Sequence, residues 1–193
     1  MTHPRTTYSG VSIFLHWTIA LMAVAQIILI SLHDKAAEGD RTWIVGHASV
    51  GMTILVLTLV RLAWRLKEPW IPMPVDTPRW QKLLARTTHV GFYLVLLAMP
   101  LAGWAAFSAF GRPIEWFGLF ELPMLPMPQS RDLGRDIMEM HELAAKLLYV
   151  LIGLHVLGAL KHQFVDRDNE VRKMLPVIPD RGYVDHRGPD GAP

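Results

Sequence analysis

Four long apolar runs alternate with short charged segments along the chain. They cover residues 12–32, 45–66, 83–107 and 139–164. At about 1.5 Å per residue, each run as a helix crosses a hydrocarbon core of about 30 Å. A membrane span must satisfy its own backbone hydrogen bonds, so all four are expected to be helices. The pattern therefore predicts an all-α membrane protein with a four-transmembrane-helix bundle.

Little chain remains outside these runs. We expect one transmembrane domain, residues 1–175, followed by a polar tail, residues 176–193, that is rich in Gly, Pro and Asp and predicted to be disordered. The 108–136 segment is the longest loop, and its aromatic residues favour a cap at the membrane surface over a disordered loop. No small-residue cleavage pattern follows the first run, so it is not expected to be a cleaved signal.

The distribution of Lys and Arg predicts the orientation, because cytoplasmic loops carry the excess of these residues. One side holds Arg5, Arg61, Arg65, Lys67, Arg79, Lys82, Arg86, Lys161, Arg167, Arg172, Lys173, Arg181 and Arg187. The other side holds Lys35, Arg41, Arg112, Arg131 and Arg135. Both termini are therefore expected to be cytoplasmic. A net charge of +2 gives no indication of nucleic-acid binding, and the absence of cysteine excludes disulfides and thiolate metal sites.

Four histidines lie inside the apolar runs, where such residues are rare and usually functional. His16 is near the inner start of the first run, and His47 is near the outer start of the second. In the fourth run His141 is near the outer start, and His155 follows about 21 Å deeper and about 40° around the helix. Depth thus pairs His47 with His141 and His16 with His155. Two imidazoles on facing helices suit iron and leave it no open position, which favours electron transfer.

A porphyrin also needs room beside its ligands. Small residues follow each of the four histidines within three or four positions: Ala20, Gly51, Ala144, Ala145, Gly158 and Ala159. Ordinary tight helix packing is the alternative explanation for each of them taken singly. The ordered set of four histidines predicts two heme groups, and a heme-free four-helix membrane protein is the remaining alternative.

Several sequence segments resemble the bacterial cytochrome b-561 family. They are Ile13-Phe14-Leu15-His16-Trp17, Gly46-His47-x3-Gly51, Arg61-x3-Arg65-x-Lys67, Met140-His141-Glu142 and Gly153-Leu154-His155. The resemblance implies a cytochrome with two heme b groups in the bacterial inner membrane, exchanging electrons with quinone. Short stand-alone members resemble superoxide oxidases, which pass electrons from superoxide to ubiquinone. Related b subunits carry electrons for periplasmic dehydrogenases or hydrogenases, and this remains the alternative function.

Other polar residues suggest further contacts. His89 and His162 lie toward the inner side and are candidates for quinone binding, with a role as interfacial residues as the alternative. Arg61 and Arg65 are candidates to bind heme propionates, although the orientation rule explains them equally well. Lys146 lies near His141 and is a candidate to attract superoxide, with plain anchoring at the interface as the alternative.

Overall fold

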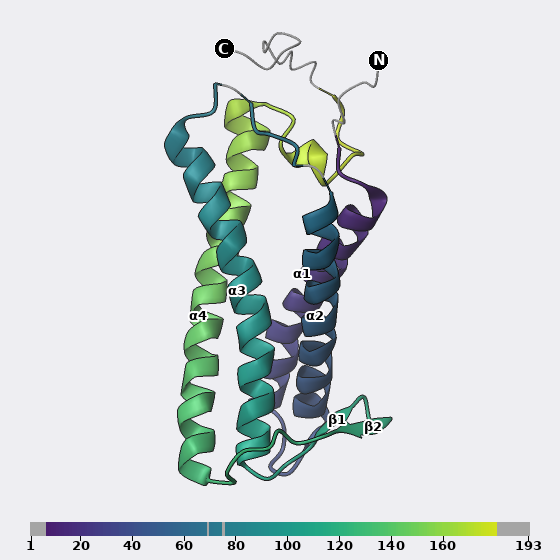
Figure 1. Ribbon diagram of the computed structural model, residues 1–193, viewed down its shortest axis with the longest axis vertical. Coiled ribbons are helices and arrows are strands. Elements are labelled where there is room, and N and C mark those ends of the chain that lie inside the picture. The colour runs from purple at the N-terminus through teal and green to yellow at the C-terminus, as the bar shows by residue number, and fades with distance from the viewer. Residues whose placement is uncertain (1–6, 69, 75, 181–193) are drawn as a thin grey trace.

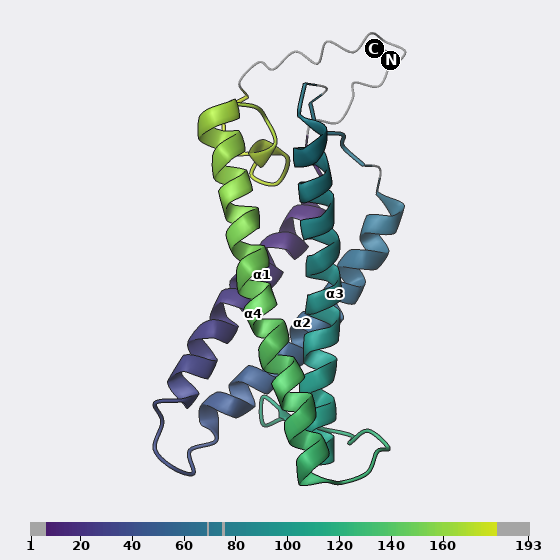
Figure 2. The same cartoon turned by 90° about the vertical axis from the view of Figure 1, so that its left-hand side faces the viewer.

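The computed structural model describes residues 7–68, 70–74 and 76–180. Four long helices form the bundle: α1 (Gly10–His33), α2 (Thr42–Lys67), α3 (Arg79–Ala109) and α4 (Arg131–Lys161). All four are long and apolar enough to cross a membrane, which confirms the predicted fold class. In Figure 1, α3 lies beside α4 and α1 beside α2, and the perpendicular view in Figure 2 shows the two pairs crossing at an angle.

The starts of α1 and α3 and the ends of α2 and α4 meet at one end of the bundle, called the inner end here; the opposite end is the outer end. The Tyr8 backbone N–H, before α1, donates to the Lys173 carbonyl, after α4, at 3.1 Å. The two ends of the described chain therefore lie on the same side of the membrane, as the sequence predicts. Which side this is remains a prediction from the Lys and Arg distribution.

A carboxylate and a serine cap fix α1 at the inner end. The Ser9 side chain accepts from the Ser12 backbone N–H at 3.3 Å, as an N-cap does. From the end of α2, Glu68 accepts from the Ser9 N–H at 2.8 Å and from the Ser12 hydroxyl. Negative charge at a helix start is stabilising, so this clamp sets the depth of His16, one turn further along α1.

The outer loop contains a short β-hairpin, an element that the sequence did not predict, and its predicted position at the membrane surface stays a prediction. Strands β1 (Ile114–Trp116) and β2 (Phe120–Leu122) pair antiparallel, with Ile114 opposite Leu122. The hydroxyl of the fully buried Ser49 on α2 shares its proton between the Val45 carbonyl at 2.7 Å and the Glu115 carbonyl at 3.0 Å, and it accepts from the Phe117 N–H at 2.8 Å. These bonds hold the hairpin against α2, where Ile114 packs with Met52 and Leu55. It projects from the outer end in Figure 1.

Helix α4 begins at Arg131, well before the predicted 139, because its first two turns are polar and fall outside the apolar run. Its N-cap is Ser130, whose side chain accepts from the Leu133 N–H at 3.3 Å. After α4 the chain forms a π-helical turn, η1 (His162–Asp166), and a 3₁₀ turn, η2 (Val171–Lys173). Residues 176–180 of the predicted tail are described, and 181–193 lie outside the described residues.

Candidate functional site

The four histidines singled out in the sequence meet in two pairs. The ring centroids of His47 on α2 and His141 on α4 are 6.1 Å apart near the outer end. The centroids of His16 on α1 and His155 on α4 are 6.0 Å apart near the inner end. Helix α4 therefore contributes one ring to each pair, and the pairing by depth is the one that the structure contains.

These separations fit a metal ion held between two imidazoles. Rings bonded from opposite sides at about 2.0 Å have centroids about 6 Å apart. His89 also lies close to His155, but its ring centroid is at 5.3 Å, which leaves less room for an ion between them. The chemistry of the donors and their spacing thus fit heme iron at the His16–His155 and His47–His141 pairs.

The backbone of α3 orients His141. Its Nδ1 lies 2.9 Å from the Met99 carbonyl oxygen, and because a carbonyl only accepts, Nδ1 carries the proton. The lone pair is then on Nε2, the nitrogen that can bind a metal. The ring packs over Gly103, where an added Cβ would lie 3.5 Å from two ring atoms. The α3 backbone therefore fixes both the tautomer and the position of this ring.

The small residues near the histidines do not all serve the same purpose. At Gly51 an added Cβ would come within 3.0 Å of Gln26 Nε2 on α1, so this glycine allows the close approach of two helices. At Gly158 an added Cβ would meet nothing within 4 Å. Helix packing thus explains Gly51, whereas the space at Gly158 is consistent with room for a large group beside His155.

His89 and Arg61 lie at the inner pair. His89 Nδ1 donates to the Ala85 carbonyl one turn earlier, at 2.6 Å, which leaves Nε2 as its acceptor. Arg61 donates from Nη1 to the Ser12 carbonyl at 2.7 Å, one turn before His16. A cation at this position is suited to a heme propionate, so Arg61 keeps its predicted role as a candidate.

Arg65 is held by aromatic rings instead. Its guanidinium lies 4.9 Å from the centroid of the Tyr8 ring and 4.4 Å from that of the Trp70 ring. Such stacking stabilises a cation while leaving the edge of its plane open for hydrogen bonds. Arg65 therefore ties Tyr8, just before α1, to the end of α2, and its predicted contact with a propionate stays a prediction.

The remaining predicted residues lie apart from the two pairs. His162 is the first residue after α4, and its Nδ1 contacts Asp168 at 2.7 Å. Lys146 is exposed on α4. It follows His141 by five residues, which places it about 140° around the helix from that ring. The structure thus brings His89 to the inner pair, gives His162 a carboxylate partner, and leaves Lys146 on a different face from His141.

The sequence as a whole matches a family of known proteins that agrees with this geometry. Residues 7–177 match the sequence profile described as prokaryotic cytochrome b561. The chain belongs to the prokaryotic cytochrome b561 family. It is a multi-pass electron-transfer protein of the inner membrane, in a family that binds heme b.

Three relatives of this cytochrome align with most of its length. A probable superoxide oxidase of Yersinia pestis is 32% identical over 88% of this chain and 96% of its own. A cytochrome b561 homolog of Escherichia coli is 29% identical over 88% of this chain and 97% of its own. A cytochrome b562 of Cereibacter sphaeroides is 29% identical over 87% and 94%, respectively.

Sequence reasoning missed the partners that orient the histidines. The Met99 carbonyl carries no side-chain signal, and only the packing of α3 against α4 brings it to His141. Asp168 lies in a charged segment beyond the last apolar run, and its contact with His162 depends on the π-helical turn that separates them. A histidine followed six residues later by an aspartate is not a pattern of regular helix, so spacing alone gave no hint of it.

Proposed function

We propose that this cytochrome b561 carries electrons from superoxide at the outer face to ubiquinone near the inner face, through one heme b at each histidine pair. The proposal rests on two histidine pairs that lie at two levels along α4. The ring centroids within these pairs are 6.0 and 6.1 Å apart. Heme iron with two imidazole ligands supplies one-electron transfer and leaves no position open for oxygen chemistry.

The residues of the chain have separate roles in this proposal. His47 and His141 hold the outer group, with the Met99 carbonyl fixing the His141 tautomer. His16 and His155 hold the inner group, with Arg61 compensating its negative charge. His89 and His162 are the candidates to hydrogen-bond a quinone at the inner end. The excess of Lys and Arg at this end favours placing it in the cytoplasm, the source of the protons for quinol formation.

The decisive experiment follows superoxide consumption by the purified protein in detergent, with and without ubiquinone-1. Quinone reduction takes two electrons and superoxide gives one, so two superoxide anions are expected to disappear for each quinol that forms. Consumption is expected to depend on added quinone. No reaction with superoxide, together with a dehydrogenase or hydrogenase subunit that co-purifies with the chain, would overturn this proposal and support an electron-conduit subunit.

Lys146→Gln is expected to slow heme reduction by superoxide at low ionic strength only. Lys146 is exposed and lies away from His141, so it acts on an anion through its long-range field. That field is screened beyond about 8 Å at physiological salt. Stopped-flow absorbance at low and at physiological salt measures the effect, and reduction by a neutral quinol serves as the control. Equal superoxide rates for variant and parent at low salt would limit Lys146 to anchoring α4.

A further inference from the structure

A compact cluster of ionisable side chains follows α4 at the inner end. After the π-helical turn, Arg167 adopts a left-handed conformation, with φ of 54°. That conformation is unfavourable for a residue with a side chain. It reverses the chain so that the Asp168 N–H donates to the His162 carbonyl at 3.3 Å and the Asp168 side chain returns to the His162 ring. Local backbone strain thus accompanies the approach of a carboxylate to this imidazole.

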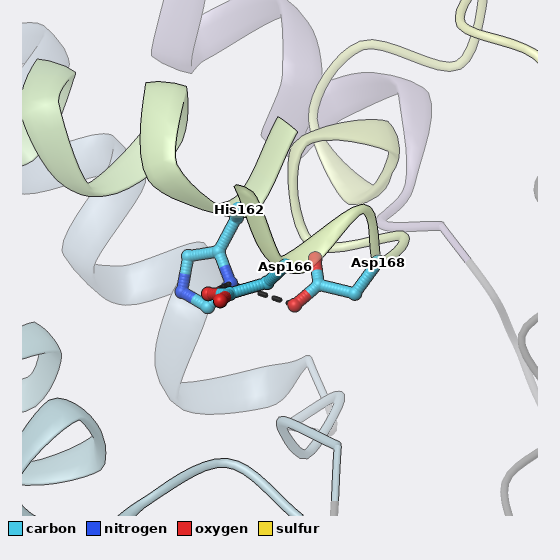
Figure 3. A group of neighbouring side chains, drawn as sticks. All are labelled: His162, Asp166 and Asp168. Atoms are coloured by element: carbon cyan, nitrogen blue, oxygen red, sulfur yellow. Dashed lines mark hydrogen bonds and ion pairs between the residues drawn. The ribbon is translucent and has the colours of Figure 1, made fainter. Parts of the chain in front are cut away.

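The contacts within the cluster are specific. His162 Nδ1 lies 2.7 Å from Asp168 Oδ2, and the other Asp168 oxygen accepts from the Glu170 backbone N–H at 2.9 Å. Asp168 is only 7% exposed. Asp166, by contrast, binds Lys161 Nζ through both oxygens, at 2.7 and 2.5 Å, and lies 3.5 Å from His162 Nδ1. Figure 3 shows the second ring nitrogen, Nε2, on the side of the ring away from Asp168.

The three side chains have donor atoms close enough together to suggest a metal site, within 4.8 Å of one another. Their existing partners argue against one. Both Asp168 oxygens already accept hydrogen bonds, and the Asp166 carboxylate is paired with the Lys161 ammonium. A metal ion would have to displace this ammonium and the proton on His162 Nδ1. The cluster is better suited to holding a proton than a metal.

The charges in the cluster favour a protonated imidazole. Burial alone would raise the pKa of Asp168, but hydrogen bonds from His162 and from the Glu170 N–H hold it below its ordinary value. The carboxylate is therefore ionised next to the ring. Asp166 and Glu170 add negative charge near His162, and Lys161 and Lys173 offset it by pairing with those two carboxylates. Asp168 thus remains the direct partner of Nδ1–H.

We propose that Asp168 positions His162 and keeps it protonated, so that Nε2–H delivers a proton to a carbonyl oxygen of ubiquinone at the inner end. The inference rests on the proposed function, which supplies the electrons. Each quinone takes two electrons, originating from two superoxide anions that become oxygen, and two protons from the cytoplasmic side. The Nε2–H bond breaks as the new O–H bond forms, and the imidazole is reprotonated from water.

The location of His162 supports this role. It follows His155 by seven residues, so it lies about 10 Å further toward the inner end and within about 20° of the same helix face. His89, whose ring is 5.3 Å from that of His155, reaches the inner pair from α3. A quinone head between these levels would be within electron-transfer range of the inner pair while its oxygen faces a proton donor.

In the test, the purified heme-loaded protein is first reduced and then mixed with ubiquinone-1. Oxidation of the heme is followed by absorbance across a pH series. Asp168→Asn is expected to slow oxidation by about tenfold, the lower end of the loss when a metal-binding imidazole loses its carboxylate partner. Without the carboxylate the imidazolium is less stable, so the rate is expected to fall at a lower pH than in the parent. Asp168→Glu is expected to restore part of the rate and the original pH profile.

Two controls separate this role from a structural one. Asp166→Asn removes a neighbouring carboxylate that is paired with Lys161. We expect it to change the rate and the pH profile of heme oxidation clearly less than Asp168→Asn does. Oxidation by ferricyanide, which takes an electron without a proton, is expected to be the same in every variant. Failure of the parent to reduce ubiquinone-1 would reject the proposed function itself. Normal quinone reduction by the parent, with an unchanged rate and pH profile in Asp168→Asn, would reject only the role of Asp168.

Discussion

His141→Ala is expected to lower the heme content of the purified protein from two groups per chain to one. The ring of His141 faces His47 at the outer end, and its orientation is fixed by the Met99 carbonyl, so the variant removes one of the two imidazoles of the outer pair. Loss of one of the two histidines that would hold the outer heme is also expected to abolish superoxide-driven reduction at the outer face. Heme extraction and the absorbance spectrum measure the change.

The matched control for this variant is His89→Ala. His89 is also a histidine on a membrane helix close to one pair, but its ring centroid lies 5.3 Å from that of His155, which leaves less room for an ion than the 6.0 Å between His16 and His155. Both heme groups are expected to remain in this variant, with slower reduction of quinone. Retention of two groups in His141→Ala, or loss of one in His89→Ala, would show that the pairing is wrong.

Gly134→Ala is expected to destabilise the bundle by about 2 kcal/mol, the usual range for overpacking a tight interface. Gly134 lies in the first turns of α4, and a Cβ there would come within 2.5 Å of the Phe110 ring at the end of α3. Either the ring or the helix must move, at the end of the bundle that contains the His47–His141 pair. Thermal unfolding followed by circular dichroism, with the outer heme band recorded in parallel, measures the effect.

Gly153→Ala makes the same chemical change on the same helix. A Cβ at Gly153 would meet nothing within 4 Å, so no contact opposes the substitution. Because alanine favours helix over glycine by about 1 kcal/mol, the unfolding temperature is expected to stay the same or rise. A similar loss of stability in both variants would mean that helix propensity or detergent contacts, and not the contact with Phe110, govern the response at Gly134.

The sequence contained enough to predict the bundle and the histidine pairs, for a physical reason. Membrane spans must be long, apolar and helical, and helix rise converts residue number into depth. That is why His141 and His155 could be assigned to two levels and matched to His47 and His16. The length of an apolar run does not predict where a helix ends, because polar turns can continue the helix beyond the run. They do so between Arg131 and residue 139.

The finer parts of the site depend on contacts that no local pattern encodes. The β-hairpin is short, and its position follows from the hydrogen bonds of Ser49 on a different element. The Met99 carbonyl and the Asp168 carboxylate reach their histidines only through helix packing and an irregular turn. Lys146 is exposed on α4 and lies about 140° around the helix from His141, so its predicted effect on superoxide would act at a distance and stays a prediction.

The central claim is that each of the two histidine pairs holds one heme iron through two imidazoles. Low-temperature electron paramagnetic resonance of the oxidised purified protein, combined with heme quantification, tests it most directly. We expect two low-spin ferric signals, two heme groups per chain, and loss of one signal each in His141→Ala and His16→Ala. A single heme per chain, or a high-spin signal in the parent protein, would contradict it.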